Sequence, residues 1–467
     1  MTDLELIEQV AMEFTKKYLS KYENEDLQKT VEKITESEIE KVAQIPVLKD
    51  GRNLNEVVKE LVEEIMPYGN NCSHHRFFGF IPGTASPLSW LGDLISSSYN
   101  RHLGSIANAP AVELIERKLI RWLNDKAGFP QTAGGTFVSG GSMANLTALT
   151  VARNKILNED EWHLGVAYIS NQTHSSVIKG LKVIGVSQKR IRIIPTNDNF
   201  EINTELLKNQ IAQDLKSGLK PFVVVASSGT TNTGSVDDFK QIRSICDEYC
   251  MWLHVDGAFG ASALLSEKYS CLLNGIETAN SISWDAHKWL FQTLGCSMLL
   301  VRDEKDLLES FCVHPEYLED IHSNDGHADP MDIGIELTRP ARFIRLWLTL
   351  QVMGENLISK SITHGIDMAK YADDLISSNP NIKVISHAKL AVLNFRYIDH
   401  NYSKEENDLL NLKISQLALN EGYAGIFTTE LNGEKVLRLC IINPRVTKEE
   451  IEQTVKKLEE YYHQAIK

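Results

Sequence analysis

Short apolar runs alternate with amphipathic patterns through the middle of the chain. Between about residues 110 and 305, six such runs are bounded by turn residues, and the candidate strands are GVAYIS, RIRIIP, PFVVVAS, MWLHVD, SISW and CSMLLV. Helical patterns fill the segments between them, as expected where a crossover helix joins parallel strands. The pattern therefore predicts an α/β domain at residues 76–350, with a mostly parallel central sheet covered on both faces.

The N-terminal segment, residues 1–75, has the pattern of charged amphipathic helices. Ile7, Val10, Ala11, Phe14 and Tyr18 recur along one helical face. This face is too small to form a core of its own. We expect it to pack on another part of the protein or on a second subunit.

The C-terminal segment, residues 351–467, differs in texture from the middle of the chain. After a long helical pattern at about 342–378 come the strand-like runs NIKVIS and LAVLNFRYI. Asn432-Gly433 is a hairpin signal between two further runs, and Thr447 with Glu450 forms a capping box before a last helix. The sequence predicts a small α+β domain.

Composition and charge narrow the choice of partners. The chain has 467 residues, a net charge of −14 and no basic run, which argues against nucleic acid and anionic membrane surfaces. The start lacks a secretory leader pattern, and no run approaches the roughly 20 apolar residues of a membrane span. We expect a cytoplasmic protein whose partner is a small molecule or another protein.

The cysteines indicate neither a disulfide framework nor a metal site. There are seven, an odd number scattered over a long chain. Cys246, Cys250 and His254 form a C-x3-C-x3-H pattern, but the histidine falls in the next strand. The pattern favours ordinary core cysteines, and no metal is predicted.

Polar residues follow several candidate strands at the point where each strand ends. In an open parallel sheet, ligands bind at the carboxyl ends of the strands, so these residues should share one surface. The set has the parts needed to hold a phosphorylated aldehyde: Ser139 to Ser142, His174, Thr230, Asp256 and Lys288.

Each member of this set also has a plainer interpretation. The glycines and serines of VSGGSMANLTAL, at the start of a helix, suit a phosphate or an ordinary tight turn. Asp256 suits a protonated pyridine nitrogen or a helix cap; His174 suits a planar ring or a cap; and Thr230 suits a turn. Their joint occurrence favours a cofactor site.

Lys288 lies between two tryptophans in SISWDAHKWL. A lysine is costly to bury unless it is paired or neutral. The residue therefore either extends outward from the edge of the core or lies in an apolar pocket as a nucleophilic amine.

In order along the chain, S-G-G-S-M-A-N, H-S-S, H-V-D-G-A and S-I-x5-K resemble the pyridoxal-phosphate (PLP) dependent group II decarboxylases. This family includes aromatic-L-amino-acid, glutamate and histidine decarboxylases. The resemblance runs from about residue 74 to 350 and implies the fold type I architecture of PLP-dependent transferases. The stretches HHRFFGFIPG, SWLGDL, SWDAHKWLFQ and ELTRPAR are most similar to bacterial tryptophan and aromatic-amino-acid decarboxylases.

The resemblance assigns roles to individual residues. Lys288 would carry PLP covalently, Asp256 would contact the pyridine nitrogen, and His174 and Ala258 would cover the two ring faces. Gly141, Ser142 and His287 match the phosphate contacts, Thr230 matches a contact to the ring substituents, and Gly354, with Met353, would reach the phosphate site of a partner subunit. A homodimer with shared sites is implied.

The proton donor is expected in the polar segment 314–340. Animal members carry a tyrosine nearer the arginine that matches Arg339, at the position held here by Pro330. Tyr317 is therefore assigned the role, against the alternative that it anchors the segment by packing.

The substrate predicted from the resemblance is an aromatic L-amino acid, with tryptophan first and phenylalanine and tyrosine next. Phe80, Ile81 and Pro82 match the part of the family that lines the substrate pocket, and His102 would complete it from the partner or lie on a surface loop. A PLP decarboxylase of a glutamate-like amino acid and a PLP-dependent carbon–carbon lyase are the alternatives. A non-catalytic relative would have lost the lysine or the aspartate, and a nicotinamide dehydrogenase would show its glycine fingerprint.

Overall fold

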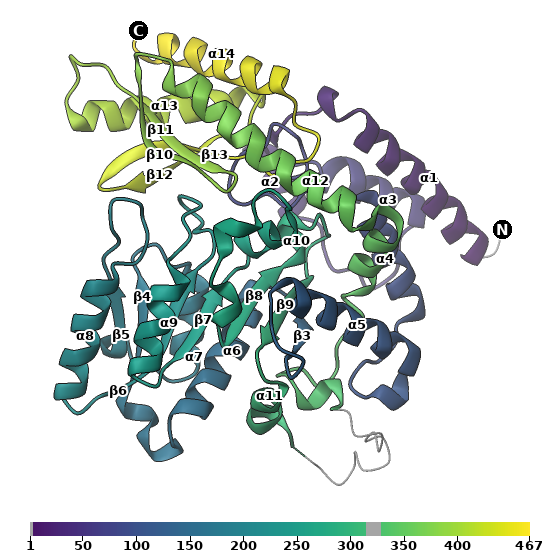
Figure 1. Cartoon of the computed structure of the whole chain (residues 1–467). Coiled ribbons are helices and arrows are strands. Elements are labelled where there is room, and N and C mark those ends of the chain that lie inside the picture. The colour runs from purple at the N-terminus through teal and green to yellow at the C-terminus, as the bar shows by residue number, and fades with distance from the viewer. Residues whose placement is uncertain (1–2, 314–327) are drawn as a thin grey trace.

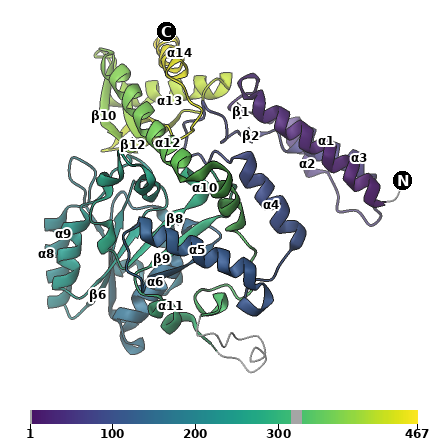
Figure 2. The same ribbon diagram turned by 45° about the vertical axis from the view of Figure 1, so that its right-hand side comes forward.

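The computed structural model describes residues 3–313 and 328–467. A large α/β domain carries a smaller C-terminal domain on one end, and the N-terminal helices project to one side (Figures 1 and 2). Within the described residues, no helix combines the length and the apolar character needed to cross a membrane.

The large domain is built on a sheet of seven strands, counted over the described residues, in the order β3-β9-β8-β7-β6-β4-β5. The strands β4 to β8 run parallel, whereas β9 is antiparallel to both of its neighbours. Their bounds are β3 (Gly134–Val138), β4 (Gly165–Ser170), β5 (Ile191–Ile194), β6 (Lys220–Ser227), β7 (Trp252–Asp256), β8 (Ser281–Asp285) and β9 (Ser297–Val301). The predicted α/β class with a mostly parallel sheet is confirmed. The edge strand β3 was not predicted, because its two leading glycines are typical of a turn.

Helices cover both faces of this sheet, as the apolar runs require. Two separate clusters of buried apolar side chains lie in the domain, one containing Val166 and Val224 and the other Ala167 and Val225, so neighbouring residues of one strand face opposite layers. The covering helices are α5 (Pro110–Lys126), α6 (Gly141–Ile156), α7 (Ser175–Val183), α8 (Thr204–Lys216), α9 (Phe239–Glu248), α10 (Ala286–Trp289) and α11 (Glu304–Phe311).

The C-terminal domain packs helices on an antiparallel sheet of order β10-β11-β13-β12. Its elements are α12 (Ile344–Ser377), β10 (Ile382–Lys389), β11 (Val392–Tyr397), α13 (Lys404–Glu421), β12 (Phe427–Leu431), β13 (Glu434–Cys440) and α14 (Lys448–Ala465). Asn432 and Gly433 turn the β12–β13 hairpin with φ of 51° and 74°, and the Thr447–Glu450 capping box opens α14. Both local predictions are confirmed.

The long helix α12 runs through the predicted domain limit at residue 350. It is broken at Gly354, whose φ of 72° is outside the helical range. The segment after His75 also belongs to both domains, since Phe78 N–H donates to the Gly425 carbonyl (2.9 Å) and Cys440 N–H donates to the Phe78 carbonyl (3.0 Å). The domain limits stay a prediction.

The N-terminal elements are α1 (Asp3–Glu23), α2 (Glu36–Ala43) and α3 (Leu54–Glu60), with a short pairing of β1 (Val31–Glu32) and β2 (Gly69–Asn70); α4 (Pro87–Tyr99) follows. The predicted apolar face of α1 is only partly covered within one chain. Ile7 and Phe14 are 53% and 39% exposed, whereas Tyr18 packs on Trp90 with ring centroids 4.8 Å apart.

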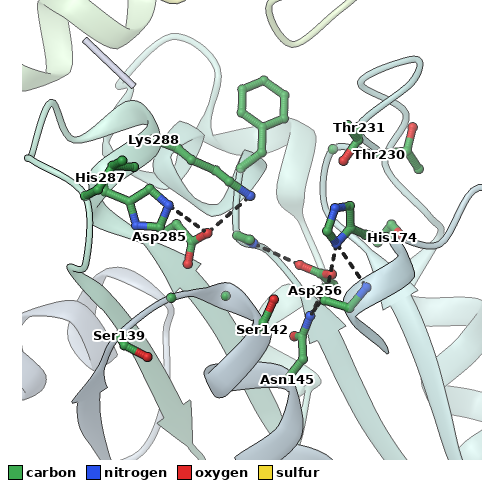
Figure 3. Close-up of a pocket in the computed structure, with 18 of the residues that line it drawn as sticks. Ser139, Ser142, Asn145, His174, Thr230, Thr231, Asp256, Asp285, His287 and Lys288 are labelled. Carbon is green, nitrogen blue, oxygen red and sulfur yellow. Dashed lines mark hydrogen bonds and ion pairs between the residues drawn. The ribbon is translucent and has the colours of Figure 1, made fainter. Parts of the chain in front are cut away.

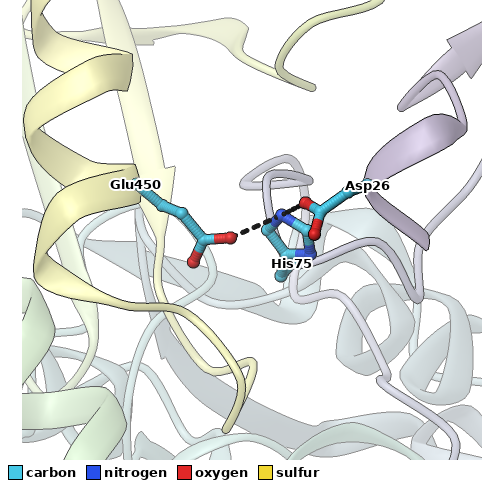
Figure 4. Close-up of side chains that lie close together, drawn as sticks. All are labelled: Asp26, His75 and Glu450. Atoms are coloured by element: carbon cyan, nitrogen blue, oxygen red, sulfur yellow. Dashed lines mark ion pairs between the residues drawn. The ribbon is translucent and has the colours of Figure 1, made fainter. Parts of the chain in front are cut away.

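An ion cluster around His75 joins this N-terminal segment to α14 (Figure 4). His75 Nε2 lies 2.7 Å from Glu450 Oε1 and 3.1 Å from Asp26 Oδ1, and Nδ1 lies 3.3 Å from Glu25 Oε2. Burial alone would lower the pKa of His75, but its hydrogen bonds to Glu25 and Glu450 raise that pKa to about 9.

The same cluster has the donor set of a metal site, yet its charges are already balanced. The acidic groups meet the protonated His75, and two arginines pair with them: Arg76 with Asp26, and Arg445 with Glu25. A metal ion would have to displace the proton of His75, which the neighbouring carboxylates stabilise. We therefore interpret the cluster as an ion-pair network.

Candidate active site

A cavity of about 380 Å³ opens at the carboxyl ends of the parallel strands (Figure 3). The structure brings together the residues that the sequence placed at those strand ends. The predicted residues that line the cavity are Ser139, Gly141, Ser142, His174, Thr230, Asp256, Ala258, His287 and Lys288.

Lys288 projects into this cavity from the short helix α10. Trp284 and Trp289 beside it are fully buried, while the lysine side chain is 21% exposed. Its Nζ lies 3.2 Å from Oδ2 of Asp285, a buried carboxylate that the sequence analysis did not single out. The lysine thus lies in the cavity with an anionic partner, so it neither extends into solvent nor lies unpaired in the core.

The start of α6 forms one wall of the cavity. Gly140 is its N-cap residue, and no side chain caps the helix. A methyl group at Gly141 would lie 2.8 Å from Asp285 Oδ2, so glycine lets the helix start approach this side of the site closely. His287 borders the same region, with its Nδ1 3.1 Å from Ser297 Oγ, and burial lowers the pKa of His287. Free N–H groups and the positive end of the helix dipole suit a phosphate.

Asp256 ends β7 at another wall of the cavity, and three donors hold its carboxylate. Asn145 Nδ2–H donates to Oδ2 (3.0 Å), while Ala258 N–H and Ser283 Oγ–H donate to Oδ1 (both 3.2 Å). A carboxylate with three donors is stabilised as an anion and cannot rotate freely. It suits a cationic ring nitrogen.

His174 and Thr230 fulfil both interpretations that the sequence left open. His174 is the N-cap of α7, where its Nδ1 accepts from Ser176 N–H (3.3 Å), and it also lines the cavity. Thr230 belongs to a tight turn, in which its carbonyl accepts from Gly234 N–H (2.8 Å), and it lines the cavity as well.

This arrangement fits pyridoxal phosphate. An amine for the aldehyde, a fixed carboxylate for the pyridinium, a helix start for the phosphate and a histidine for a ring face border one cavity of suitable size. Pyridoxal phosphate needs both an amine for its aldehyde and a carboxylate for its ring nitrogen. Lys288 and Asp256 supply these two groups, which a nicotinamide cofactor would not need together.

None of the predicted substrate residues lines this cavity. A methyl group at Gly83 would overlap the carbonyl oxygen of His287, so the chain passes against α10 directly after Phe80, Ile81 and Pro82. Phe80 is 53% exposed, has a φ of 53° and packs on Phe427 with ring centroids 4.8 Å apart. Ile81 and Pro82 continue this wall. A non-glycine residue with a positive φ is uncommon and often marks a functional segment.

Two other predicted residues lie away from the cavity lining, and a third is not among the described residues. His102 is exposed, and its ring nitrogens meet Thr338 Oγ1 and Asn108 Nδ2 at 3.0 Å each. Gly354 lies at the break in α12 and does not line the cavity. Tyr317 lies outside the described residues. The roles of these residues stay predictions.

Arg438 is a candidate that sequence reasoning missed. It lies on β13, and its guanidinium donates to the carbonyls of Phe80 and Asn232, while its buried Nη2 has no partner among the described residues. Burial lowers its pKa. A hydrophobic strand interrupted by one arginine, as in KVLRLCII, is the only sequence signal for it.

Comparisons with known proteins agree with this geometry. The family model described as "Pyridoxal-dependent decarboxylase conserved domain" matches residues 39–398. An aromatic-L-amino-acid decarboxylase of Bacillus atrophaeus is 38% identical over 411 residues, which cover 88% of this chain and 85% of that protein. Tryptophan decarboxylase 2 of Oryza sativa subsp. japonica is 28% identical, covering 87% of this chain and 84% of the relative.

Among solved structures, the Oryza sativa TDC determined with PLP and tryptamine superposes with a TM-score of 0.94. It is 24% identical in sequence, and the match covers 100% of both chains. At this identity, the likeness establishes the fold.

Proposed function

This chain belongs to the pyridoxal-dependent decarboxylase family, and we propose that it decarboxylates aromatic L-amino acids, with tryptophan first and phenylalanine and tyrosine next. It is a PLP-dependent carboxy-lyase, and its cofactor is pyridoxal phosphate. The products are carbon dioxide and the matching arylalkylamine. The observation that carries the proposal is the convergence of Lys288, Asp256, His174 and the start of α6 on one cavity.

When bound, pyridoxal phosphate supplies a protonated ring that accepts the electron pair left by the departing carbon dioxide. Lys288 would hold the cofactor through its aldehyde carbon, at the position where the substrate amine would also bind. Asp256, fixed by its three donors, holds the proton on the ring nitrogen. His174 orients the ring, and the N–H groups at the start of α6 hold the phosphate. Tyr317 is the proposed donor of the proton that replaces carbon dioxide at the α-carbon.

The aromatic preference is supported by the 38% identical relative and by the character of the wall next to α10. Phe77, Phe80 and Phe427 form one aromatic cluster, with centroid distances of 4.8 to 6.1 Å. A flat ring is stabilised against such a surface, whereas a glutamate side chain would have to leave water.

Arg438 is the observation that favours the alternative, a glutamate-like substrate. Its buried guanidinium donates to the carbonyl oxygen of Phe80. Its Nε–H and one N–H of Nη1 are used on backbone carbonyls, whereas Nη2 has no hydrogen-bond partner among the described residues and could donate to a carboxylate. Every amino-acid substrate has an α-carboxylate, so Arg438 does not by itself require a second carboxylate on the substrate.

Measuring kcat/KM for tryptophan, phenylalanine, tyrosine and glutamate tests the proposal. We expect the three aromatic substrates to exceed glutamate by at least 100-fold. Ranking among them is a smaller effect, since one ring or hydroxyl difference in an apolar pocket changes kcat/KM by roughly 10- to 200-fold. Glutamate as the best substrate would refute the aromatic class, and tyrosine ahead of tryptophan would refute only the order.

We infer that the enzyme is a homodimer with shared active sites. Large apolar side chains on α1 and α4 are exposed in the single chain, among them Leu4 (78%), Met12 (53%) and Leu94 (51%). Exposed apolar surface of this extent is typical of an interface. In the dimer, His102 and Gly354 would lie near the partner's cavity. Sedimentation velocity of the holoenzyme tests this, and an active monomer would refute it.

A cytoplasmic location is also part of the proposal. All seven cysteines are free thiols in the structure, which is usual in a reducing compartment.

A further inference from the structure

A chain of buried hydrogen bonds lies behind the cavity and connects Asp256 with His174. It starts at Trp252 and passes through Ser281, His254 and Asn145, all of which are at most 2% exposed. Because each group can only donate or accept in certain ways, the direction of every bond in this chain can be derived.

The direction is fixed at the Trp252 end. The indole Nε1 is a donor only, so Ser281 Oγ accepts from it at 2.8 Å. The hydroxyl proton of Ser281 is then free to point to His254 Nδ1, also at 2.8 Å. Burial lowers the pKa of His254 to about 4, opposed in part by Asp256, so the ring is neutral and Nδ1 has a lone pair to accept.

The direction is fixed independently at the Asp256 end. Asp256 accepts from Asn145 at 3.0 Å, so the amide of Asn145 must present its NH2 group to this carboxylate. Its carbonyl oxygen Oδ1 therefore faces His254 Nε2, 3.0 Å away, and accepts a proton from it. The Asp256 end thus requires the proton of His254 on Nε2, and the Trp252 end is consistent with this tautomer, because the Ser281 hydroxyl can donate to Nδ1.

Asn145 divides the chain into two branches. The second N–H of its amide donates to Ser176 Oγ at 3.0 Å, and Ser176 donates its hydroxyl proton to His174 Nδ1 at 2.8 Å. His174 Nδ1 also accepts from Ser176 N–H. Because Nδ1 accepts from two donors, the N–H of the His174 ring is at Nε2.

We propose that Asn145 is a positioning residue, which holds the Asp256 carboxylate as the anionic partner of the cofactor's ring nitrogen and, through Ser176 Oγ, supports the hydrogen bond to His174 Nδ1. This inference rests on the proposed function only through the identity of the cofactor. Asn145 lies on α6, Asp256 on β7 and His174 at the start of α7, so one amide coordinates three elements that border the cavity.

The test uses Asn145→Asp, which keeps the shape of the side chain and replaces its donor with a second carboxylate facing Asp256. The control is Asn154→Asp on the same helix, because Asn154 only accepts from Arg153 and an aspartate can do the same. Each apoenzyme is titrated with pyridoxal phosphate and with a carbocyclic analogue in which C–H replaces the ring nitrogen.

We expect Asn145→Asp to weaken binding of pyridoxal phosphate about 10- to 100-fold, the range for losing a hydrogen bond to a charged group. Binding of the analogue, which has no ring nitrogen to pair with Asp256, should weaken less than about 3-fold, and Asn154→Asp should leave both constants unchanged. Equal weakening for the two cofactors would show a merely structural role and overturn the proposal, as would no weakening for either. No amino acid is present, so a wrong substrate class cannot produce these outcomes.

A measurement on the unchanged protein covers the case in which the variant fails to fold. Histidine-selective ¹⁵N NMR of the holoenzyme should show the N–H of both His254 and His174 at Nε2, with each Nδ1 accepting a hydrogen bond. A proton on Nδ1 of His254 would reverse the chain of hydrogen bonds, and the proposal would then be wrong.

Discussion

Replacing His75 by glutamine should loosen the attachment of the N-terminal segment to α14 in a pH-dependent way. In the folded protein, Glu25, Asp26 and Glu450 surround the ring, and the side chain of His75 is 6% exposed. Its pKa rises from the ordinary 6.5 to about 9. At about 1.4 kcal/mol for each tenfold change in proton affinity, this rise corresponds to roughly 3 kcal/mol.

The sign of the pH dependence follows from the raised pKa. The folded protein binds the proton more tightly than the unfolded chain, so the contribution is complete below pH 6.5 and is lost as the pH rises through about 9. Glutamine stays neutral throughout. We therefore expect His75→Gln to be less stable than the parent by about 2 to 3 kcal/mol at pH 6, and nearly equal to it at pH 10.

Hydrogen exchange of the holoenzyme locates the effect. At pH 6, the amides of residues 24–32 and of the first turn of α14 should exchange faster in the variant. In thermal unfolding, the difference in Tm between the parent and the variant should shrink as the pH rises from 6 to 10. His463→Gln is the matched control: it is the same change on α14, at an exposed histidine paired with Glu459. A deficit of His75→Gln that persists undiminished at pH 10, or no deficit at pH 6, would refute the charge argument.

Three further predictions concern other residues. Borohydride reduction of the holoenzyme should place the pyridoxyl label on Lys288, and a label on another lysine would contradict the site. Tyr317→Phe should bind substrate but lose amine formation at least tenfold, with some product diverted to aldehyde by dioxygen; full amine turnover would return Tyr317 to a packing role. Burial and Glu116 raise the pKa of Glu113 to about 8, so the parent loses stability as the pH rises from 4.5 toward 8. The free energy of unfolding of Glu113→Gln, taken relative to the parent, should therefore be roughly 1 to 3 kcal/mol more favourable at pH 9 than at pH 5. Urea unfolding measures this difference, and an equal value at both pH values would argue against a neutral Glu113.

The strand ends were predictable because two local signals agree there. An apolar run sets the strand, and the residue after it must lie at the carboxyl edge of a parallel sheet, so His174, Thr230 and Asp256 could be placed together from the sequence. Asp285 also follows a predicted strand, SISW, although it was not singled out, whereas Arg438 and Asn145 could not be placed in this way. Arg438 reaches Phe80 from 358 positions away, and Asn145 meets His254 across 109 positions. No local period reports such contacts, because they depend on how whole domains pack.

The pattern Cys246, Cys250 and His254 shows how a local spacing can suggest the wrong chemistry. A spacing of four places two side chains on one face only while the helix continues. Here α9 ends at Glu248, and Cys250 has a φ of 54°, so the chain reverses between the two cysteines. Cys246 is buried and Cys250 is exposed, and both ring nitrogens of His254 are used on Ser281 and Asn145. The alternative of ordinary core residues describes Cys246 correctly, whereas His254 acts in the polar chain behind Asp256.

Lys288 could be interpreted from the sequence because its neighbours restrict the helix that carries it. Consecutive residues of a helix are about 100° apart, so a helix that buries Ala286 and Trp289 must turn His287 and Lys288 away from the core. The structure has this arrangement, with the outer two residues of α10 buried and the middle two partly exposed. The large apolar side chains therefore do not surround the lysine. They hold α10 in place, and the same packing directs Lys288 and His287 into the cavity that we propose as the cofactor site.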